Sequence, residues 1–353
     1  MNQLTAIRIG TRKSPLAMAQ SRWVADALCA RHPGLRAELV PVVTGGDRYF
    51  GPLHEVGGKG LFTAELESAL REGTIDLAVH SAKDLPAAMA ADLAIVAVPA
   101  REDPRDALVT VSGATIQSLA AGAAVGTSSP RRGAQIRTMR PDARIVPLRG
   151  NVDTRLRKVL EEAQVDATIL AMAGLIRAGL LEKNRPHVCP LEVEDFIPAA
   201  GQGALAIEAA VANRRAAALA AAMDHEPSRQ ALEAERQVVA HLDADCKSSL
   251  AVHVRLAPKG ADQQTRQQFL GNDGGQAGSN VGLPVGAVGP LTKKSSGSQT
   301  PTEWKATLWA SRPDGSGAYR RTLTAATAIQ AAQELVQLCQ AQGVRELLLG
   351  KLP

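Results

Sequence analysis

One pattern recurs through the first two hundred residues and limits what the chain can fold into. A short apolar run is followed by a polar loop, and then by apolar residues at helical spacing, as at residues 7–9, 75–79 and 167–170. Such alternation of strand and helix predicts an α/β fold with a mostly parallel sheet in each of two units. Ligands bind at the carboxyl ends of strands in open sheets of this kind, so the polar loops are the predicted binding region.

The predicted strands divide into two groups and leave one strand over. The first group comprises residues 7–9, 39–43, 75–79 and 93–98, and the second comprises 124–126, 145–148 and 167–170. The remaining strand, 203–209, can return the chain to the first unit. We therefore expect two α/β domains that exchange segments and share a cleft: residues 1–100 with 201–224, and residues 101–200.

The pattern changes after about residue 225, where a third domain (225–353) is predicted. A helix at 228–242 precedes alternating strands at 250–256, 304–310 and 319–323, and a helix at 325–341 follows. This order indicates a small antiparallel sheet with helices packed against it. The stretch 258–302 is rich in Gly, Gln and Ser, which predicts a flexible insertion between two strands.

Composition restricts the classes of function. The 353-residue chain has a formal net charge of +5, which fits an acidic partner, but aromatic residues are only 3% of it. That scarcity argues against stacking on nucleic-acid bases. No signal peptide and no apolar run long enough for a membrane span is found, so we expect a cytoplasmic protein. The four cysteines show no CxxC pair or zinc-like spacing, so no metal is expected.

The run from Gly126 to Arg132 (GTSSPRR) carries the strongest chemical signal. Ser128 or Ser129 can cap a helix whose first position suits Pro130. Free backbone N–H groups and the helix dipole then meet Arg131 and Arg132 at one point. Guanidinium groups bind carboxylates or phosphates in bidentate geometry, so the run predicts an anion site. The alternative is a capped helix with solvated arginines.

Other loops at strand ends repeat this cationic character. Together five loop regions place cations on one rim, which favours a shared cleft for an anionic ligand over a chance surface distribution: Arg12, Lys13 and Ser14; His80, Ser81, Lys83 and Asp84; residues 127–132; Arg149, Gly150, Asn151 and Arg155; and Arg177.

Asp84 is the exception, because it is an acid among these cations. It is either one half of a structural salt bridge or a carboxylate aimed at positive charge that develops in the ligand. His80 is interpreted as a hydrogen-bonded structural histidine rather than a metal ligand. Lys59 stands in a glycine-rich run that lacks the spacing of a phosphate loop.

Eight segments, in order, resemble those of porphobilinogen deaminases, also called hydroxymethylbilane synthases. They cover much of residues 5–257, and the resemblance resumes at about 303–350: RIGTRKSPLA (8–17), VGGKGLF (56–62), AVHSAKDLP (78–86), REDPRD (101–106), VGTSSPRR (125–132), LRGNV (148–152), LAMAGL (170–175) and PAAGQGA (198–204).

The resemblance implies a transferase of haem and tetrapyrrole biosynthesis. Enzymes of this family join four porphobilinogen molecules head to tail, release ammonia at each step and yield the linear tetrapyrrole hydroxymethylbilane. They have two domains similar to periplasmic binding proteins and a third α/β domain. A dipyrromethane cofactor, attached to a cysteine through a thioether, primes the growing chain. With this family we expect a cytoplasmic monomer that needs no metal, membrane or nucleic acid.

Site residues follow from the same resemblance, position by position. Cys246 matches the cofactor-bearing cysteine. Asp84 matches the catalytic aspartate, which holds pyrrole N–H groups and stabilises the cationic azafulvene. The other implied cofactor-binding residues are Ser81, Lys83, Thr127, Ser128, Ser129, Arg131, Arg132, Arg149 and Gly150. The implied substrate-binding residues are Arg12, Ser14, Gln20, Lys59, Phe62, Arg149, Arg155, Arg177 and Gln202.

The chain also departs from the family pattern. Residues 243–249 read DADCKSS, without the glycines before the cysteine and the proline after it that the family usually has. Glu55 stands where a lysine is frequent, and the insertion 258–302 has no counterpart. The altered loop leaves an alternative, a relative on the same two-lobed scaffold that binds pyrroles or other organic anions without turnover.

Overall fold

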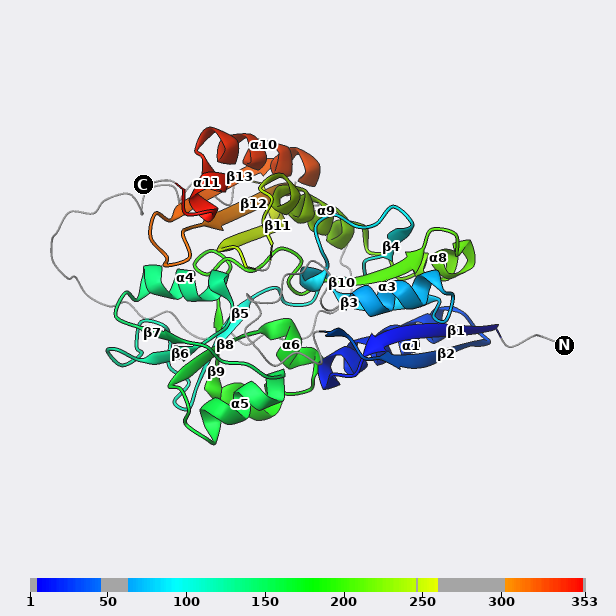
Figure 1. Ribbon diagram of the computed structural model, residues 1–353, viewed down its shortest axis with the longest axis horizontal. Coiled ribbons are helices and arrows are strands. Elements are labelled where there is room, and N and C mark those ends of the chain that lie inside the picture. Colours follow the sequence, from blue (N-terminus) through cyan, green and yellow to red (C-terminus); the bar gives the residue numbers. More distant parts are fainter. Residues whose placement is uncertain (1–4, 46–62, 246, 260–301, 352–353) are drawn as a thin grey trace.

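Three sheets with their helices make up the computed structural model of this chain (Figure 1). The structure describes residues 5–45, 63–245, 247–259 and 302–351. Strands of the first sheet come from residues 5–97 and 205–210, those of the second from 106–191, and those of the third from 250–325. Within the described ranges no helix combines the length and apolar character needed to cross a bilayer.

The first sheet, sheet A, has the strand order β2-β1-β3-β10-β4. Strand β1 pairs in parallel with β2 and β3, whereas β10 runs antiparallel to both β3 and β4. Helices α1 and α8 pack on one face and α3 packs on the other. The bounds are β1 Thr5–Arg12, α1 Pro15–Arg31, β2 Leu35–Val42, α3 Ala64–Arg71, β3 Leu77–Ser81, β4 Leu93–Ala97, β10 Leu205–Ala210 and α8 Arg214–Ala221.

Sheet B repeats this arrangement in the order β7-β6-β8-β5-β9. Strand β6 pairs in parallel with β7 and β8, and β5 runs antiparallel to β8 and β9. Helix α4 packs on one face, and α5 and α6 pack on the other. The bounds are β5 Asp106–Thr110, β6 Ala124–Gly126, α4 Pro130–Met139, β7 Arg144–Val146, α5 Val152–Leu160, β8 Ala167–Ala171, α6 Met172–Arg177, α7 Leu181–Asn184 and β9 Val188–Leu191.

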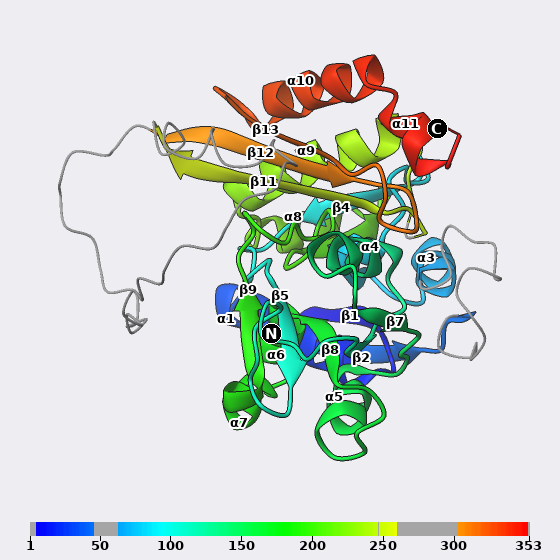
Figure 2. The same cartoon turned by 90° about the vertical axis from the view of Figure 1, so that its left-hand side faces the viewer.

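Sheet C is the small antiparallel sheet that the sequence predicts, in the order β11-β12-β13. Helices α9 and α10 share its core, and Figure 2 shows this unit stacked on the other two. Its second face meets sheet B's unit, because Ala251 and Trp309 pack against Ala134 of α4. The bounds are α9 Glu226–His241, β11 Leu250–Pro258, β12 Thr302–Ala310, β13 Tyr319–Ala325, α10 Ala328–Ala341 and α11 Val344–Leu348.

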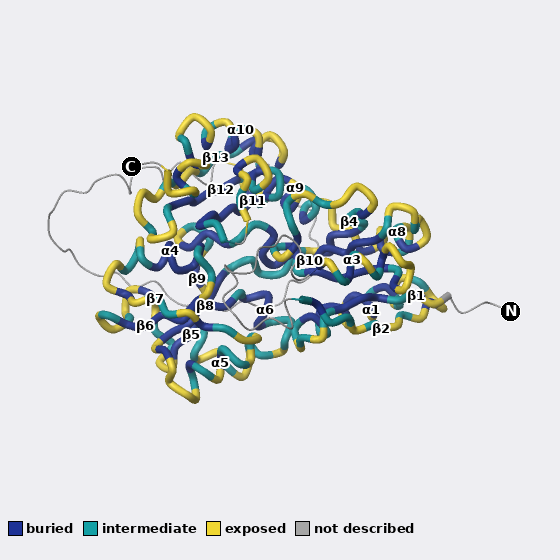
Figure 3. Tube along the Cα trace, in the orientation of Figure 1, coloured by how far each residue is buried: buried dark blue, intermediate teal, exposed yellow. Residues whose placement is uncertain are grey.

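The structure confirms one topological expectation and corrects another. Strand β10 lies inside sheet A, so the chain does return to its first unit. The sheets are mixed rather than mostly parallel, because β10 and β5 are antiparallel to their neighbours. Strand β5 is not among the predicted strands, because its first residue, Asp106, ends a polar run (101–106); all five residues of the strand are nevertheless buried. Figure 3 shows this burial along the sheet strands.

The predicted insertion 258–302 falls almost wholly outside the described residues. Its two bounding residues, Pro258 and Thr302, pair with each other at the end of the β11–β12 ladder. Strand β11 is therefore two residues longer than the alternating pattern suggests.

Candidate active site

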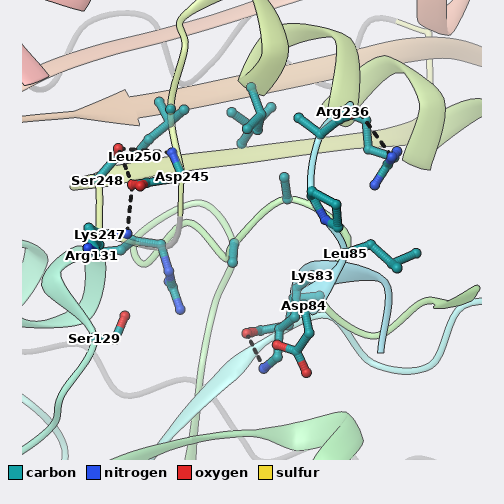
Figure 4. Close-up of a pocket in the computed structure, with 18 of the residues that line it drawn as sticks. Lys83, Asp84, Leu85, Ser129, Arg131, Arg236, Asp245, Lys247, Ser248 and Leu250 are labelled. Atoms are coloured by element: carbon teal, nitrogen blue, oxygen red, sulfur yellow. Dashed lines mark hydrogen bonds between the residues drawn. The ribbon is translucent and has the colours of Figure 1, made fainter. Parts of the chain in front are cut away.

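A cavity of about 490 Å³ lies where the three units meet. In Figure 4, Lys83 and Asp84 lie together on one side of it, and Arg131, Asp245 and Lys247 lie across from them. Its polar lining contains many of the residues singled out from the sequence: Lys83, Asp84, Ser128, Ser129, Arg131, Arg132, Arg155 and Gln202. Arg236 and the residues Asp243, Asp245, Lys247 and Ser248 add a further polar wall.

Asp84 reaches the cavity from a single turn of 3-10 helix, η1 (Ala82–Asp84), directly after β3. The backbone N–H of Ala82 donates to the carbonyl of Ala204 on the return crossing (3.0 Å), and the Ala82 side chain is buried. This anchor leaves Asp84 exposed, with its carboxylate open to the cavity. The acid that sequence reasoning singled out thus lies in the wall shared with the cations.

Lys83 is held beside Asp84 by a buried amide. Its Nζ donates to Oε1 of Gln202 over 3.4 Å. Burial, together with the positive charge of Arg132, lowers the pKa of Lys83 to about 8. Gln202 also donates to Oδ1 of Asp106 (3.0 Å) and to the carbonyl of Pro104 (2.8 Å), so it joins two interdomain crossings to the cavity wall.

The predicted cap of the arginine helix is confirmed. Ser129 is the N-cap of α4, its Oγ accepts from the N–H of Arg132, and Pro130 occupies the first turn. Both arginines are buried rather than solvated, which excludes the alternative of a merely solvated pair: Arg131 is 5% exposed and Arg132 is 7% exposed.

Asp106 is the buried partner of both arginines. Nη1 of Arg131 lies 2.7 Å from Oδ2 of Asp106, and Nη2 of Arg132 lies 2.6 Å from Oδ1. Burial alone would raise the pKa of Asp106, but the charges of Arg131 and Arg132 outweigh it and hold that pKa far below its usual range. Nη1 of Arg131 also donates to the backbone carbonyl of Ile197, and Nη1 of Arg132 donates to that of Ile169.

Asp106 is not among the predicted site residues, although it is the last residue of the family-like segment 101–106. An acid immediately before an apolar run is a weak signal, because most such acids end a loop. Its pairing with Arg131 and Arg132 depends on the antiparallel placement of β5 beside β8, which the strand pattern did not reveal.

Arg155 enters the cavity from α5 and has no carboxylate bound to it among the described residues. Its Nε donates to the carbonyl of Gly150 (2.8 Å). Burial, together with the positive charges of Arg132 and Arg149, lowers the pKa of Arg155 to about 10. Gly150 has φ +123°, and a Cβ there would lie 2.7 Å from the Thr154 methyl group, so this turn requires glycine.

Two other predicted arginines lie outside the large cavity. Arg149 is half-buried, and its positive charge helps to lower the pKa of Arg155. Nη2 of Arg177 donates to the carbonyl of Gly203 over 2.8 Å, and burial lowers the pKa of Arg177 to about 10. Arg177 therefore contacts the return crossing between the sheets.

A second, small cavity of about 20 Å³ adjoins Asp84 on the side of sheet A. Gln20 and Ser81 exchange hydrogen bonds in its wall, at 3.1 and 3.3 Å. The other polar residues lining it are Arg12, Thr63, His80 and Asp84. Ser14 is absent from both linings; its Oγ accepts from the N–H of Ala17 as the N-cap of α1.

His80 is hydrogen-bonded, as the sequence interpretation expected. Its Nε2 lies 2.9 Å from Oε2 of Glu208 on β10, and both side chains are buried. The described residues hold no cluster of metal-ligating side chains.

The turn on either side of position 246 is shaped by an aspartate. Oδ1 of Asp245 accepts from the backbone N–H of Lys247 (2.9 Å) and from Oγ of Ser248 (3.1 Å). These bonds supply local order where the family's glycines and proline are missing. Cys246, Lys59 and Phe62, three of the predicted site residues, lie outside the described residues.

Arg236 is a site residue that sequence reasoning missed. It lies on α9, lines the large cavity and donates from Nη2 to the carbonyl of Ala87 (3.0 Å). Burial lowers the pKa of Arg236. An arginine inside a helix rich in charged residues gives no local signal of function.

Cations outnumber acids in the polar wall of the large cavity. Among the described residues the lining holds six cations and three acids: Lys83, Arg131, Arg132, Arg155, Arg236 and Lys247, against Asp84, Asp243 and Asp245. Buried arginines bind carboxylates through short, charge-assisted hydrogen bonds. The arrangement can therefore hold an anion with several carboxylates and place one protein carboxylate, Asp84, against it.

Comparison with known proteins agrees with this chemistry. A family model described as "Porphobilinogen deaminase, dipyromethane cofactor binding domain" matches residues 7–218. Porphobilinogen deaminase from Syntrophotalea carbinolica is 47% identical over 72% of this chain and 79% of its own length. The enzyme from Streptococcus sanguinis is 43% identical, covering 77% and 89%. That from Roseiflexus sp. (strain RS-1) is 44% identical, covering 78% and 92%.

Among solved structures, the periplasmic aliphatic sulphonate binding protein SsuA from Escherichia coli covers 60% of this chain and 63% of its own, with 21% identity and a TM-score of 0.34. The family model alone matches more than half of the chain, and the relatives are over 40% identical across more than two thirds of it. The chain belongs to the porphobilinogen deaminase family.

Proposed function

We propose that the large cavity is the active site at which this chain carries out the hydroxymethylbilane synthase reaction. Four porphobilinogen molecules are joined head to tail, ammonia is released at each step, and a linear tetrapyrrole results. The observation that carries the assignment is the meeting of three elements in one cavity: Asp84 of sheet A's unit, the arginines of sheet B's unit, and Asp245 and Lys247 on either side of position 246.

The cavity fits the dipyrromethane cofactor of the family. Each pyrrole ring of that group carries two carboxylates. Arg155 is buried in the wall with no carboxylate partner among the described residues, and its pKa is lowered to about 10 by burial and neighbouring arginines. Such a cation gains most from a bound anion. Bound through a thioether to Cys246, the dipyrromethane supplies the pyrrole carbon to which the first substrate is joined.

Asp84 is the proposed catalytic residue. Its carboxylate is exposed to the cavity, whose lining also contains Lys83, Arg131 and Arg132. An ionised carboxylate accepts hydrogen bonds from pyrrole N–H groups, stabilises positive charge at the reacting carbon and accepts a proton.

The cations are proposed to bind the acetate and propionate groups of the rings. Arg131 and Arg132 are already oriented by Asp106, so they lose little freedom when an anion binds. Ser128, Ser129 and Thr127 surround the start of α4 and are proposed to help hold the cofactor, with Ser81, Lys83, Arg149 and Gly150. Arg12, Gln20, Arg155, Arg177 and Gln202 are proposed to face substrate, as are Ser14, Lys59 and Phe62.

The proposed domains are residues 1–100 with 201–224, residues 101–200, and residues 225–353. We propose a monomer that works in the cytoplasm and binds no nucleic acid. The shared motifs and the three-walled cavity support the proposed domains and the proposed reaction. A relative that binds pyrroles without turnover is not favoured, because the matched relatives are named porphobilinogen deaminase.

The first test is the intact mass of the purified protein with a peptide map around Cys246, after expression in a host that makes porphobilinogen. We expect a mass above the sequence value by one dipyrromethane, located on Cys246, and release of ammonia from added porphobilinogen. An unmodified Cys246 and no ammonia would favour the binding-only relative. Cys246→Ser is the matched control, which should remain unmodified and inactive.

A further inference from the structure

The small cavity lies between Asp84 and His80, and His80 belongs to a buried pair with Glu208 that the proposed mechanism does not use. His80 lines this cavity together with Asp84, and its Nε2 is hydrogen-bonded to Oε2 of Glu208 at 2.9 Å. The two side chains are 3% and 1% exposed. A volume of about 20 Å³ is enough for one water molecule, and Gln20, Ser81 and Thr63 offer it polar partners.

Glu208 is unusual for a buried carboxylate. Its Oε1 is buried without a hydrogen-bond partner among the described residues, and within that part of the chain its side chain is bonded to His80. A buried carboxylate is costly unless hydrogen bonds and positive charge balance it. Its negative charge is therefore available to stabilise a proton on the imidazole.

The hydrogen bond at Nε2 also selects the tautomer of His80. When Nε2 donates to Glu208, Nδ1 carries the lone pair and becomes the nitrogen that accepts a proton. The same division of roles between a histidine and a buried carboxylate operates in catalytic triads.

The reaction needs an acceptor for one proton in each cycle. The C–N bond of the aminomethyl group breaks, and its electron pair leaves with ammonia. A C–C bond forms to the ring carbon of the neighbouring pyrrole. The C–H bond of that carbon then breaks, its electron pair stays in the ring, and the hydrogen leaves as a proton. Asp84 takes this proton and must lose it before the next cycle.

We propose that His80 and Glu208 are positioning residues that form a proton relay behind Asp84. A single water molecule in the small cavity passes the proton from Asp84 to Nδ1 of His80. Glu208 stabilises the resulting imidazolium, and the proton then leaves to the departing ammonia or to solvent. This inference rests on the proposed function and adds the step that returns Asp84 to its carboxylate form.

Charged groups from four elements surround the pair. Arg12 of β1 and Asp84 of η1 line the same small cavity. A hydrogen bond to Asp92 raises the pKa of Arg71 on α3, and the negative charge of Glu208 adds to this rise. Burial lowers the pKa of Arg236 on α9, and the charge of Glu208 opposes this lowering.

The test compares turnover of porphobilinogen in H2O with turnover in D2O. For Glu208→Gln we expect kcat to fall about tenfold or more. KM should change little, and intact mass should still show the dipyrromethane. The solvent deuterium effect on kcat should rise above the parent value, because transfer of the exchangeable proton from Asp84 to His80 becomes rate-limiting, and the pH profile of kcat should change shape. Glu38→Gln, an exposed residue on β2, is the matched control.

A merely structural role gives a different result. If Glu208→Gln lowers kcat without raising the deuterium effect, or leaves kcat unchanged, the relay is wrong. His80→Gln is the second variant, because it removes the acceptor nitrogen while leaving Glu208 in place; should Glu208→Gln fail to fold, His80→Gln decides by the same criteria. If the parent protein itself does not consume porphobilinogen, the proposed function fails instead.

Discussion

Sheets A and B have the same strand order and the same pairing directions, yet their loops carry opposite chemistry. After β3 of sheet A the chain places an acid, Asp84, in the cavity. After β6 of sheet B it places Arg131 and Arg132 there. The sheets set where the loops meet, and the loop residues decide which unit binds anions and which one handles positive charge and protons.

The difference extends to two buried acids on equivalent strands. Glu208 lies on β10 and Asp106 on β5, each in the fourth place of its sheet. Asp106 accepts hydrogen bonds from two arginines and from Gln202, so its charge is fixed. Among the residues that the structure describes, Glu208 has a histidine partner and one oxygen without a hydrogen bond. The first acid builds a permanent anion site, and the second adjoins groups that exchange protons.

The largest effect is expected from Asp84→Ala. Removing the carboxylate should lower turnover by roughly a hundredfold to ten-thousandfold, because general acid–base and charge stabilisation are both lost. The side chain is exposed, so the fold and cofactor loading should persist. Ammonia release and intact mass measure the two properties. The control is Asp92→Ala, which removes an exposed acid that directly precedes β4 and pairs with Arg71. Near-normal turnover in Asp84→Ala would exclude the proposed role.

The next largest effect is expected on stability, from Asp106→Asn. This change removes the negative charge that balances two buried arginines, and breaking such a buried pair costs about 3–5 kcal/mol in free energy of unfolding. Urea unfolding at neutral pH measures it. Asp142→Asn, at an exposed acid paired with Arg140, should change stability little. Equal stability of the two variants would show that Asp106 does not hold the arginines.

The pH dependence of stability sharpens the same comparison. The pKa of Asp106 in the folded protein is held below the ordinary value of 3.8. Stability from this group is therefore complete above the ordinary value and lost as pH falls through it toward the folded value. Between about pH 7 and pH 3, the gap in unfolding free energy between the parent and Asp106→Asn should narrow. A gap that stays constant over this range would contradict the depressed pKa.

What the sequence could reveal follows the same division. Asp84 and the arginines stand in loops with distinctive local patterns, so the cationic rim and its single acid were predicted from residue order alone. The partners Asp106 and Glu208 were not, because each sits on an antiparallel strand that pairs with distant residues. Local periodicity reports burial and spacing but not which strands become neighbours. The sequence pattern predicted that the strand corresponding to β10 can return to sheet A, whereas it predicted no strand at the position of β5.

Arg155→Ala should separate binding from stability in sheet B's unit. Arg155 is a desolvated cation with no carboxylate partner among the described residues, so its loss should leave the unfolding free energy unchanged or higher. Binding of a ring carboxylate should weaken by about 1.5–3 kcal/mol, the value of a charge-assisted hydrogen bond. Intermediates of partial length should then accumulate, which intact mass detects during turnover. Arg157→Ala, at a more exposed arginine on α5 that pairs with Glu162, is the control. Full-length product at the normal rate would count against the carboxylate-binding role.

The smallest effect compares two helix caps, one in each unit. Ser129 caps α4 beside the cavity, and Asn213 caps α8 far from it, where its Oδ1 accepts from the N–H of Ala216 at 3.1 Å. Ser129→Ala and Asn213→Ala should each lower the free energy of unfolding by about 1 kcal/mol, because each leaves a helix N–H without its cap. Only Ser129→Ala should also slow turnover, since the freed first turn of α4 carries Arg131 and Arg132. Urea unfolding and ammonia release distinguish the two. If both variants kept normal turnover, the position of Arg132 would depend on Asp106 alone and not on the cap.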